Sequence, residues 1–156
     1  MSKTVYISYD MINKLYRYDE VNGGVVRRDG KGVTPKPYGN GYIYCAFMMD
    51  SVAYRYRAHR LVYLLHNPDM DQSLSIDHIN GLTADNRIEN LRLVTVAENS
   101  FNTKALGFYW VGKLRKFRAQ IGISRGLISL GCYDNILDAR AAYLRAKKKY
   151  HIIEER

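Results

Sequence analysis

Residues 75–81 read Ser-Ile-Asp-His-Ile-Asn-Gly, residues 86–92 read Asn-Arg-Ile-Glu-Asn-Leu-Arg, and residues 95–99 read Thr-Val-Ala-Glu-Asn. Apolar and polar side chains alternate over residues 74–79 and again over residues 91–95, and Gly, Asp and Asn residues lie between these two runs. Such alternation predicts strands, and the residues between them predict a turn. The stretch is therefore expected to form a β-hairpin with a long loop.

A short helix is predicted directly after this hairpin. Thr95 and Glu98 have the spacing of a capping box, so we expect the helix to begin at Val96. Its first turns would carry Asn99 and Asn102. The predicted order is strand, loop, strand, helix.

The polar residues of this segment suit metal-assisted hydrolysis. Asp77 and His78 are adjacent on one predicted strand, so their side chains point to opposite faces and must have different roles. One of these two side chains can bind a cation together with Asn99 of the helix, while the other points towards a water and a phosphate. Carboxylate and amide oxygens suit Mg²⁺, which takes few protein ligands and keeps several waters. A neutral imidazole suits proton removal near pH 7.

These residues and spacings resemble the HNH endonucleases with the ββα-metal fold, particularly the phage and intron-encoded homing type. The resemblance implies that Asp77 is a metal ligand and that His78 is the general base. It further implies that Asn90 braces the loop and orients His78, and that Asn99 is the second metal ligand. Asn102 is an alternative ligand, although a place on the helix surface or a phosphate contact is favoured for it.

The segment before the hairpin also resembles this family. Residues 58–63 read Ala-His-Arg-Leu-Val-Tyr, as in the helix that precedes the motif in such proteins, and Arg60 could reach a phosphate. His59 or His66 would be a ligand only if a second metal were present, and packing or solvent contact is favoured for each. The pairs at residues 80–81 and 85–86 are common turn dipeptides, so they are left out of the candidate site.

Composition sets outer limits on the fold and the location of the protein. The chain has 156 residues, of which 47% are hydrophobic, enough for one domain or two small ones with a core. No apolar run is long enough to cross a membrane, and the amino terminus lacks the features of a signal peptide, so we expect a cytoplasmic protein with no membrane partner. The resemblance to homing endonucleases implies that a phage encodes it and that it acts in the host cytoplasm. Cys45 and Cys132 are the two cysteines, too few for a structural zinc site or a disulfide framework, and we expect both to be buried.

Positive charge is concentrated in the last third of the chain. Residues 1–103 hold 12 Lys and Arg against 11 Asp and Glu, whereas residues 104–156 hold 12 against 4, so +8 of the net charge of +9 lies in the second part. Such a concentration favours sequence-independent binding to phosphates, with an affinity that falls steeply with salt. We therefore expect the second part to bind double-stranded DNA.

The basic part is predicted to be a three-stranded sheet with one helix. Residues 107–111, 117–123 and 127–131 read as strands separated by Gly-containing turns. Asn135 can cap the helix that follows, whose alanines and Tyr143 make a narrow apolar stripe. Phe117, Ala119 and Ile121 would face this helix, leaving Lys116, Arg118 and Gln120 on the opposite, DNA-facing side.

This arrangement resembles the DNA-binding domain of plant ethylene-response factors, the Apetala-two type, in residues 107–110, 116–121, 130–134 and 139–143. The resemblance implies that the sheet enters the major groove. The implied contacts are made by Trp110, Arg115, Arg118 and Arg125, beside Lys116. Trp110 is equally well explained as a core residue. The chain departs from the pattern at Tyr109, where Arg is common, and at Phe117, where Trp is common.

The first sixty residues predict an antiparallel platform. Residues 16–18, 25–27, 42–47 and 53–57 look like strands, and the helix over residues 58–66 should end at Asn67-Pro68. Tyrosines alternating with arginines suit either a DNA groove or a half-solvated sheet, so no contacts are assigned there.

The sequence thus predicts an α+β protein in which residues 1–103 form an HNH nuclease domain and residues 104–156 form a basic DNA-binding domain. The expected cofactor is one Mg²⁺ or Mn²⁺, without structural zinc, and the products would carry 5′-phosphate and 3′-hydroxyl ends. A monomer should nick one strand, whereas a double-strand break needs a homodimer or two successive events. The rival hypotheses are a non-catalytic DNA-binding protein on an HNH scaffold, either a regulator or a packaging accessory, and a restriction enzyme.

Overall fold

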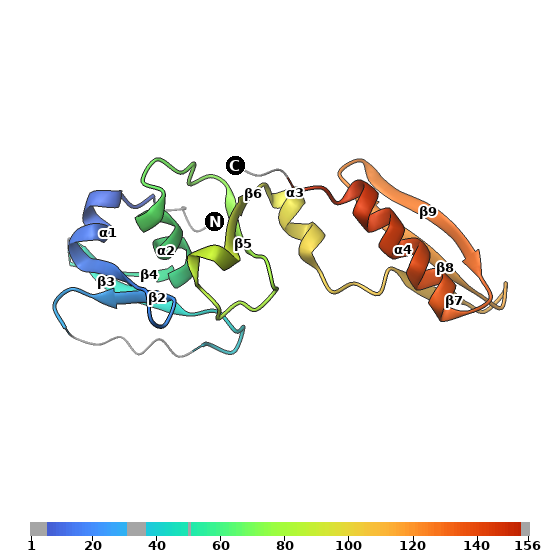
Figure 1. Cartoon of the computed structure of the whole chain (residues 1–156), viewed down its shortest axis with the longest axis horizontal. Helices are drawn as coiled ribbons and strands as arrows, with labels where there is room; N and C mark the ends of the chain where they lie inside the picture. The colour runs from blue at the N-terminus through green and yellow to red at the C-terminus, as the bar shows by residue number, and fades with distance from the viewer. Residues whose placement is uncertain (1–5, 31–36, 50, 154–156) are drawn as a thin grey trace. The chain divides into compact units, whose positions relative to one another are not determined.

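The structure is a computed structural model that describes residues 6–30, 37–49 and 51–153. The chain divides into two compact units, one that runs to Leu93 and one that begins at Val94 (Figure 1). The division thus falls at the end of the predicted hairpin, before the short helix that carries Asn99.

Two hairpins and two helices build most of the first unit. Helix α1 spans Tyr9–Leu15 and is capped by the Ser8 hydroxyl, which accepts a hydrogen bond from the Met11 amide. Strands β1 (Tyr16–Asp19) and β2 (Gly24–Arg27) pair antiparallel, as do β3 (Tyr44–Met49) and β4 (Val52–Arg57). The strands fall where the alternating patterns predicted them, whereas helix α1 was not predicted from the sequence.

Helix α2 (Ala58–His66) is the centre of the first core. Six of its nine residues are buried, including Leu61, Val62 and Leu64, and they pack against Ile12, Tyr16 and the inner side of β3. A helix that is apolar on most sides has to be covered on most sides, which explains why two small sheets surround it. Asn67 ends the helix, as the following proline requires.

The predicted hairpin is formed by β5 (Ser75–His78) and β6 (Leu91–Val94), which pair in a two-stranded sheet. A single turn of 3₁₀ helix, Ile88–Asn90, closes the long loop between them. Beyond β6, helix α3 spans Val96–Asn99 and continues into a 3₁₀ turn at Ser100–Asn102. Thr95 and Glu98 make both hydrogen bonds of the capping box, so the predicted start of α3 is confirmed.

The second unit contains a three-stranded antiparallel sheet and one long helix. Strands β7 (Phe108–Val111), β8 (Lys116–Ile123) and β9 (Gly126–Tyr133) lie in that order, and helix α4 spans Ile136–Tyr150. The Asn135 side chain caps α4 by accepting a hydrogen bond from the Asp138 amide at 2.9 Å. Small side chains at the contact allow a close approach of helix and sheet, because Ala119 of β8 packs against Ala139 and Ala142.

The segment between α3 and β7 is fixed to α4. The Phe101 ring stacks on His151 with centroids 4.2 Å apart, and Lys147 Nζ donates to the Thr103 carbonyl at 3.0 Å. Arg140 Nη1 donates to the carbonyls of Ala105 and Leu106, at 2.6 and 2.7 Å. These contacts make residues 101–106 an integral part of the second unit.

The expected mixed fold of helices and small antiparallel sheets is confirmed. The two cysteines differ from expectation in part. Cys45 is buried, which raises the pKa of its thiol to about 12, but Cys132 is exposed, because it pairs with Arg118 on the side of the sheet that α4 does not cover. Among the described residues, no helix is long and apolar enough to span a membrane.

Candidate active site

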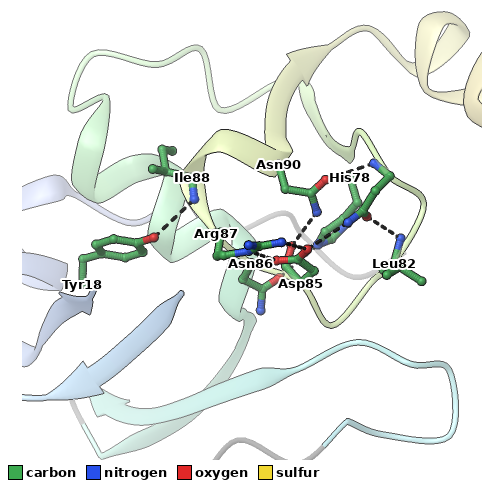
Figure 2. Close-up of polar contacts among 9 residues, drawn as sticks. Tyr18, His78, Leu82, Asp85, Asn86, Arg87, Ile88 and Asn90 are labelled. Carbon is green, nitrogen blue, oxygen red and sulfur yellow. Dashed lines mark hydrogen bonds and ion pairs between the residues drawn. The ribbon is translucent and has the colours of Figure 1, made fainter. Parts of the chain in front are cut away.

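His78 lies at the end of β5 with its ring held by a buried amide. The side chain is only 4% exposed, and its Nε2 lies 3.0 Å from Oδ1 of Asn86, which is 2% exposed (Figure 2). An amide oxygen only accepts, so in this contact Nε2 is the donor. The contact therefore holds the Nε2 end of the ring against the loop.

Asn86 was expected to be an ordinary turn residue outside the site, together with Asp85, but its side chain contacts His78. The loop between β5 and β6 folds back over the end of β5, so that one of its turn residues points inward at His78. No local pattern in the sequence distinguishes Asn86 from an ordinary turn asparagine. The contact between Asn86 and His78 joins two distant parts of the loop, so it forms only when the whole loop is closed.

A network of polar contacts holds that loop closed. Asp85 accepts from Arg87 at 2.7 and 2.8 Å and from Asn80 Nδ2 at 2.8 Å (Figure 2). The Arg87 guanidinium holds the pKa of the Asp85 carboxyl well below its usual value. Since residues 85 and 87 flank Asn86, their pairing fixes the backbone from which the Asn86 side chain reaches His78.

Asn90 connects the two ends of the same loop. Its Nδ2 donates to the Asp85 carbonyl at 2.7 Å, and its Oδ1 accepts from the Asn80 amide at 3.0 Å. Its own carbonyl accepts from the Ile79 amide, next to His78, at 2.8 Å. Asn90 therefore braces the loop, while the amide that reaches the His78 ring belongs to Asn86.

Asp77 is a buried carboxylate with a cationic partner. It is 7% exposed, and its Oδ2 accepts from both Nε and Nη2 of Arg92 on the neighbouring strand, at 2.9 and 2.7 Å. Two donors on one oxygen fix the orientation of the carboxylate. The ion pair with Arg92 offsets part of the cost of burying the Asp77 carboxylate.

The donor set fits a hard divalent cation better than zinc. Among the residues that the structure describes, no group of three or more His, Cys, Asp and Glu side chains gathers to hold a metal. An oriented carboxylate such as that of Asp77 is the kind of oxygen ligand that Mg²⁺ prefers, and that ion keeps several waters.

Asn99, the other predicted metal ligand, is the last residue of α3 and belongs to the second unit. Its side chain is exposed, whereas the neighbouring Asn102 is partly buried. The capping box at Thr95 and Glu98 fixes the turn from which Asn99 projects. Asp77 and Asn99 therefore come from different units, and their joint role is part of the proposal below.

Arg60 has structural contacts that the sequence did not indicate. Its Nη1 donates to the Leu74 carbonyl at 3.0 Å and its Nη2 to the Gln72 carbonyl at 2.7 Å, and burial lowers the pKa of the guanidinium. Arg60 thus ties α2 to the segment that leads into β5. His66, at the other end of α2, contacts the Val62 carbonyl through Nδ1 and packs its ring edge-on against Tyr18.

The second unit presents a basic, aromatic sheet face on the side away from α4. Arg118 of β8 lies between Tyr109 of β7 and Cys132 of β9 in the register, and hydrogen bonds to these two side chains raise the pKa of its guanidinium. Tyr109 is exposed and was not selected from the sequence, since it stands where the resemblance placed an Arg. Tyr109 and Arg118 therefore form the centre of this face.

The other predicted DNA contacts are spread around this sheet. Trp110 pairs with Phe117 in the register, 4.8 Å between ring centroids, on the side of the sheet that faces α4, yet it is half exposed. Lys116 forms an ion pair with Asp134 at 3.2 Å. Arg115 has a positive φ in the turn before β8, and Arg125 lies in the turn after it.

Comparison with known proteins agrees with this arrangement. Residues 56–101 match the model of the HNH endonuclease family, a range that includes Asp77, His78, Asn86, Asn90 and Asn99. The fold of the chain is similar to the solved structure described as "DNA binding and cleavage by the HNH homing endonuclease I-HmuI", with a TM-score of 0.52 and 21% identity over 92% of this chain and 85% of that chain. No curated protein matches the chain. Part of the chain therefore matches the HNH endonuclease family, and the fold is similar to that of a solved HNH homing endonuclease.

Proposed function

We propose that this protein is a metal-dependent DNA endonuclease of the HNH homing type. The observation that carries the proposal is the buried His78 ring, held at Nε2 by Asn86 and next in sequence to the oriented carboxylate of Asp77. The same residues lie in the segment that matches the HNH endonuclease family.

In this proposal His78 takes a proton from the water that attacks phosphorus. Asn86 keeps the proton of the resting ring on Nε2, so that Nδ1 is ready to accept the second proton. As His78 becomes cationic, the Asn86 oxygen stabilises it, since both ring nitrogens of the imidazolium are donors. Positioned general bases contribute roughly 10²- to 10⁴-fold to a rate.

Asp77 and Asn99 would hold one Mg²⁺ or Mn²⁺. When bound, the cation supplies charge stabilisation for the phosphate and for the leaving 3′ oxygen. Arg92 keeps the Asp77 carboxylate in one orientation for that role, from the next strand. The products would carry 5′-phosphate and 3′-hydroxyl ends.

The second unit would bind double-stranded DNA through the sheet face of Tyr109 and Arg118, in the manner of the Apetala-two domains that it resembles. The +8 balance of residues 104–156 supports phosphate binding, and the exposed aromatic and guanidinium groups on one face suit contact with a groove. A phage-encoded enzyme acting in the host cytoplasm is the setting that this proposal favours.

The test is cleavage of supercoiled DNA from candidate phages and hosts with Mn²⁺ or Mg²⁺, beside an EDTA control. Nicked or linear product should appear with the metal, disappear with EDTA, and disappear in His78→Ala while DNA binding persists. His66→Ala is the matched control, because His66 is an exposed histidine of the same unit. Unchanged cleavage in folded His78→Ala would refute the assignment of the base, and tight, salt-sensitive binding without cleavage would favour the non-catalytic DNA-binding rival.

A further inference from the structure

The outer face of the β3–β4 hairpin carries two exposed arginines, Arg55 and Arg57. In the antiparallel register Arg57 lies opposite Tyr44, and Arg55 is two residues before Arg57 on β4, so the three side chains share one face of the sheet. Cys45 and Phe47 alternate with Tyr44 on β3 and are buried in the core on the other face. The two arginines therefore project away from the core.

Tyrosine rings hold both guanidinium groups in place. The guanidinium carbon of Arg55 lies 4.7 Å from the centroid of the Tyr38 ring and 4.4 Å from that of the Tyr44 ring. The guanidinium carbon of Arg57 lies 4.5 Å from the centroid of the Tyr42 ring. Because the ring faces attract these cations, part of the side-chain freedom that an arginine loses on binding a ligand is already lost in the free protein.

Neither arginine has an acidic partner in the part of the chain that the structure describes. The ion pairs found there join other cations to carboxylates, and none of them includes Arg55 or Arg57. Opposite charges that face each other across a sheet stabilise it, but the residues opposite the two arginines are Tyr44 and Ala46. Two uncompensated positive charges are therefore gathered on one face, in a domain whose overall balance over residues 1–103 is only +1.

The arginines border the candidate active site. The centroid of the Tyr42 ring, over which Arg57 lies, is 6.0 Å from that of His78 and 5.5 Å from that of His59. His59 is 3% exposed and meets the His78 ring edge-on, with centroids 4.9 Å apart. All of these residues belong to the first compact unit. Arg57 and His78 are therefore neighbours of the same tyrosine ring.

We propose that Arg55 and Arg57 bind two neighbouring backbone phosphates of the DNA strand that His78 cleaves. The tyrosine rings contact the faces of the guanidinium groups and leave N–H groups at their edges, through which a guanidinium binds a phosphate with two parallel hydrogen bonds. Residues two apart on a strand are separated by roughly 7 Å. This separation is close to that between neighbouring phosphates of a DNA strand. The inference rests on the proposed function, because the strand is the one presented to His78.

The first test measures DNA binding without cleavage, by fluorescence anisotropy of a labelled duplex in EDTA at several salt concentrations. Each phosphate contact contributes about 0.9 to the slope of log Kd against log salt, so the double variant Arg55→Gln/Arg57→Gln should lower this slope by about two. The double variant Arg55→Lys/Arg57→Lys keeps both charges and should keep the slope. Arg17→Gln removes an exposed arginine from β1 of the same unit and should leave the slope unchanged. Circular dichroism confirms that each variant is folded.

The second test measures single-turnover cleavage with Mn²⁺ at saturating DNA. The double glutamine variant should cleave roughly ten- to a hundredfold more slowly, since misplacing a reacting group by about 1 Å costs on the order of 10² in rate, while Arg17→Gln should cleave at the wild-type rate.

A folded double glutamine variant with an unchanged salt slope or an unchanged rate would overturn the inference. The same loss of slope in the double lysine variant would also overturn it, because the effect would then come from the structure of the hairpin and not from the two charges. Absence of cleavage by the wild type would instead refute the proposed function, and the binding measured in EDTA would still decide whether the two arginines contact phosphates.

Discussion

Replacing Asn86 by Leu tests the hydrogen bond on which the candidate active site depends. Leucine has a similar size and no acceptor, so the change removes the partner of His78 Nε2 and leaves the volume of the loop largely unaltered. His78 is only 4% exposed, so water cannot substitute for the lost oxygen. A buried donor without a partner costs about 1–3 kcal/mol. The ring can relieve this cost by moving the proton to Nδ1, which makes Nε2 the basic nitrogen and leaves Nδ1 unable to accept a proton.

That cost gives the magnitude of the expected effect on catalysis. At about 1.4 kcal/mol for each factor of ten, a penalty of 1–3 kcal/mol corresponds to a rate roughly five- to 150-fold lower. The assay is single-turnover cleavage of supercoiled DNA, with circular dichroism to confirm folding. Asn22→Leu, the same substitution at an exposed asparagine of the same unit, should leave the rate unchanged. A folded Asn86→Leu protein that cleaves within twofold of the wild-type rate would refute the reasoning.

Three further predictions concern DNA binding and stability. Arg118→Ala should weaken binding to all DNA sequences and reduce the slope of log Kd against log salt by about one, measured by fluorescence anisotropy at several salt concentrations; an unchanged slope would exclude a phosphate contact. Because the pKa of His59 is lowered to about 3 in the folded protein, the unfolded chain binds the extra proton first, so the free energy of unfolding should fall as the pH drops below about 6.5, by at most about 1.4 kcal/mol per pH unit. Urea titrations should show this slope in the wild type and a smaller one in His59→Phe, and equal slopes would contradict the assignment. Phe101→Ala should destabilise the second unit by about 3–5 kcal/mol in the same titrations, because it empties a buried site that stacks on His151, and a loss below 1 kcal/mol would show that the stack is not structural.

Local chemistry made part of this structure predictable from the sequence. The start of α3 follows from Thr95 and Glu98, whose capping box involves only neighbouring residues. The contact between β8 and α4 follows from the alternation that places Ala119 and Ile121 on one side of the strand. In both cases the residues that decide the structure lie within one or two turns or strands of each other.

The features that could not be predicted depend on contacts between distant residues. Asn86 looks like any turn asparagine until the closed loop brings it to His78, and His59 looks like a packing residue of α2 until the hairpin is placed beside that helix. Cys132 was expected to be buried on composition alone, but its side of β9 is the one that α4 leaves uncovered. Sequence patterns identify faces and turns, and they do not specify which side chains meet across the fold.

The attachment of residues 101–106 to α4 limits where recombination between related proteins can join their segments. The Phe101 ring stacks on His151, and the side chains of Arg140 and Lys147 donate to backbone carbonyls of residues 103–106, so the segment that follows α3 is attached to α4, although α3 lies in the range that matches the nuclease family. A recombination that replaced residues 104–156 alone would leave this segment without its supporting surface. Recombinants that keep a folded α3 would therefore inherit Asn99 together with the sheet of β7, β8 and β9, and these elements would pass between lineages as one block.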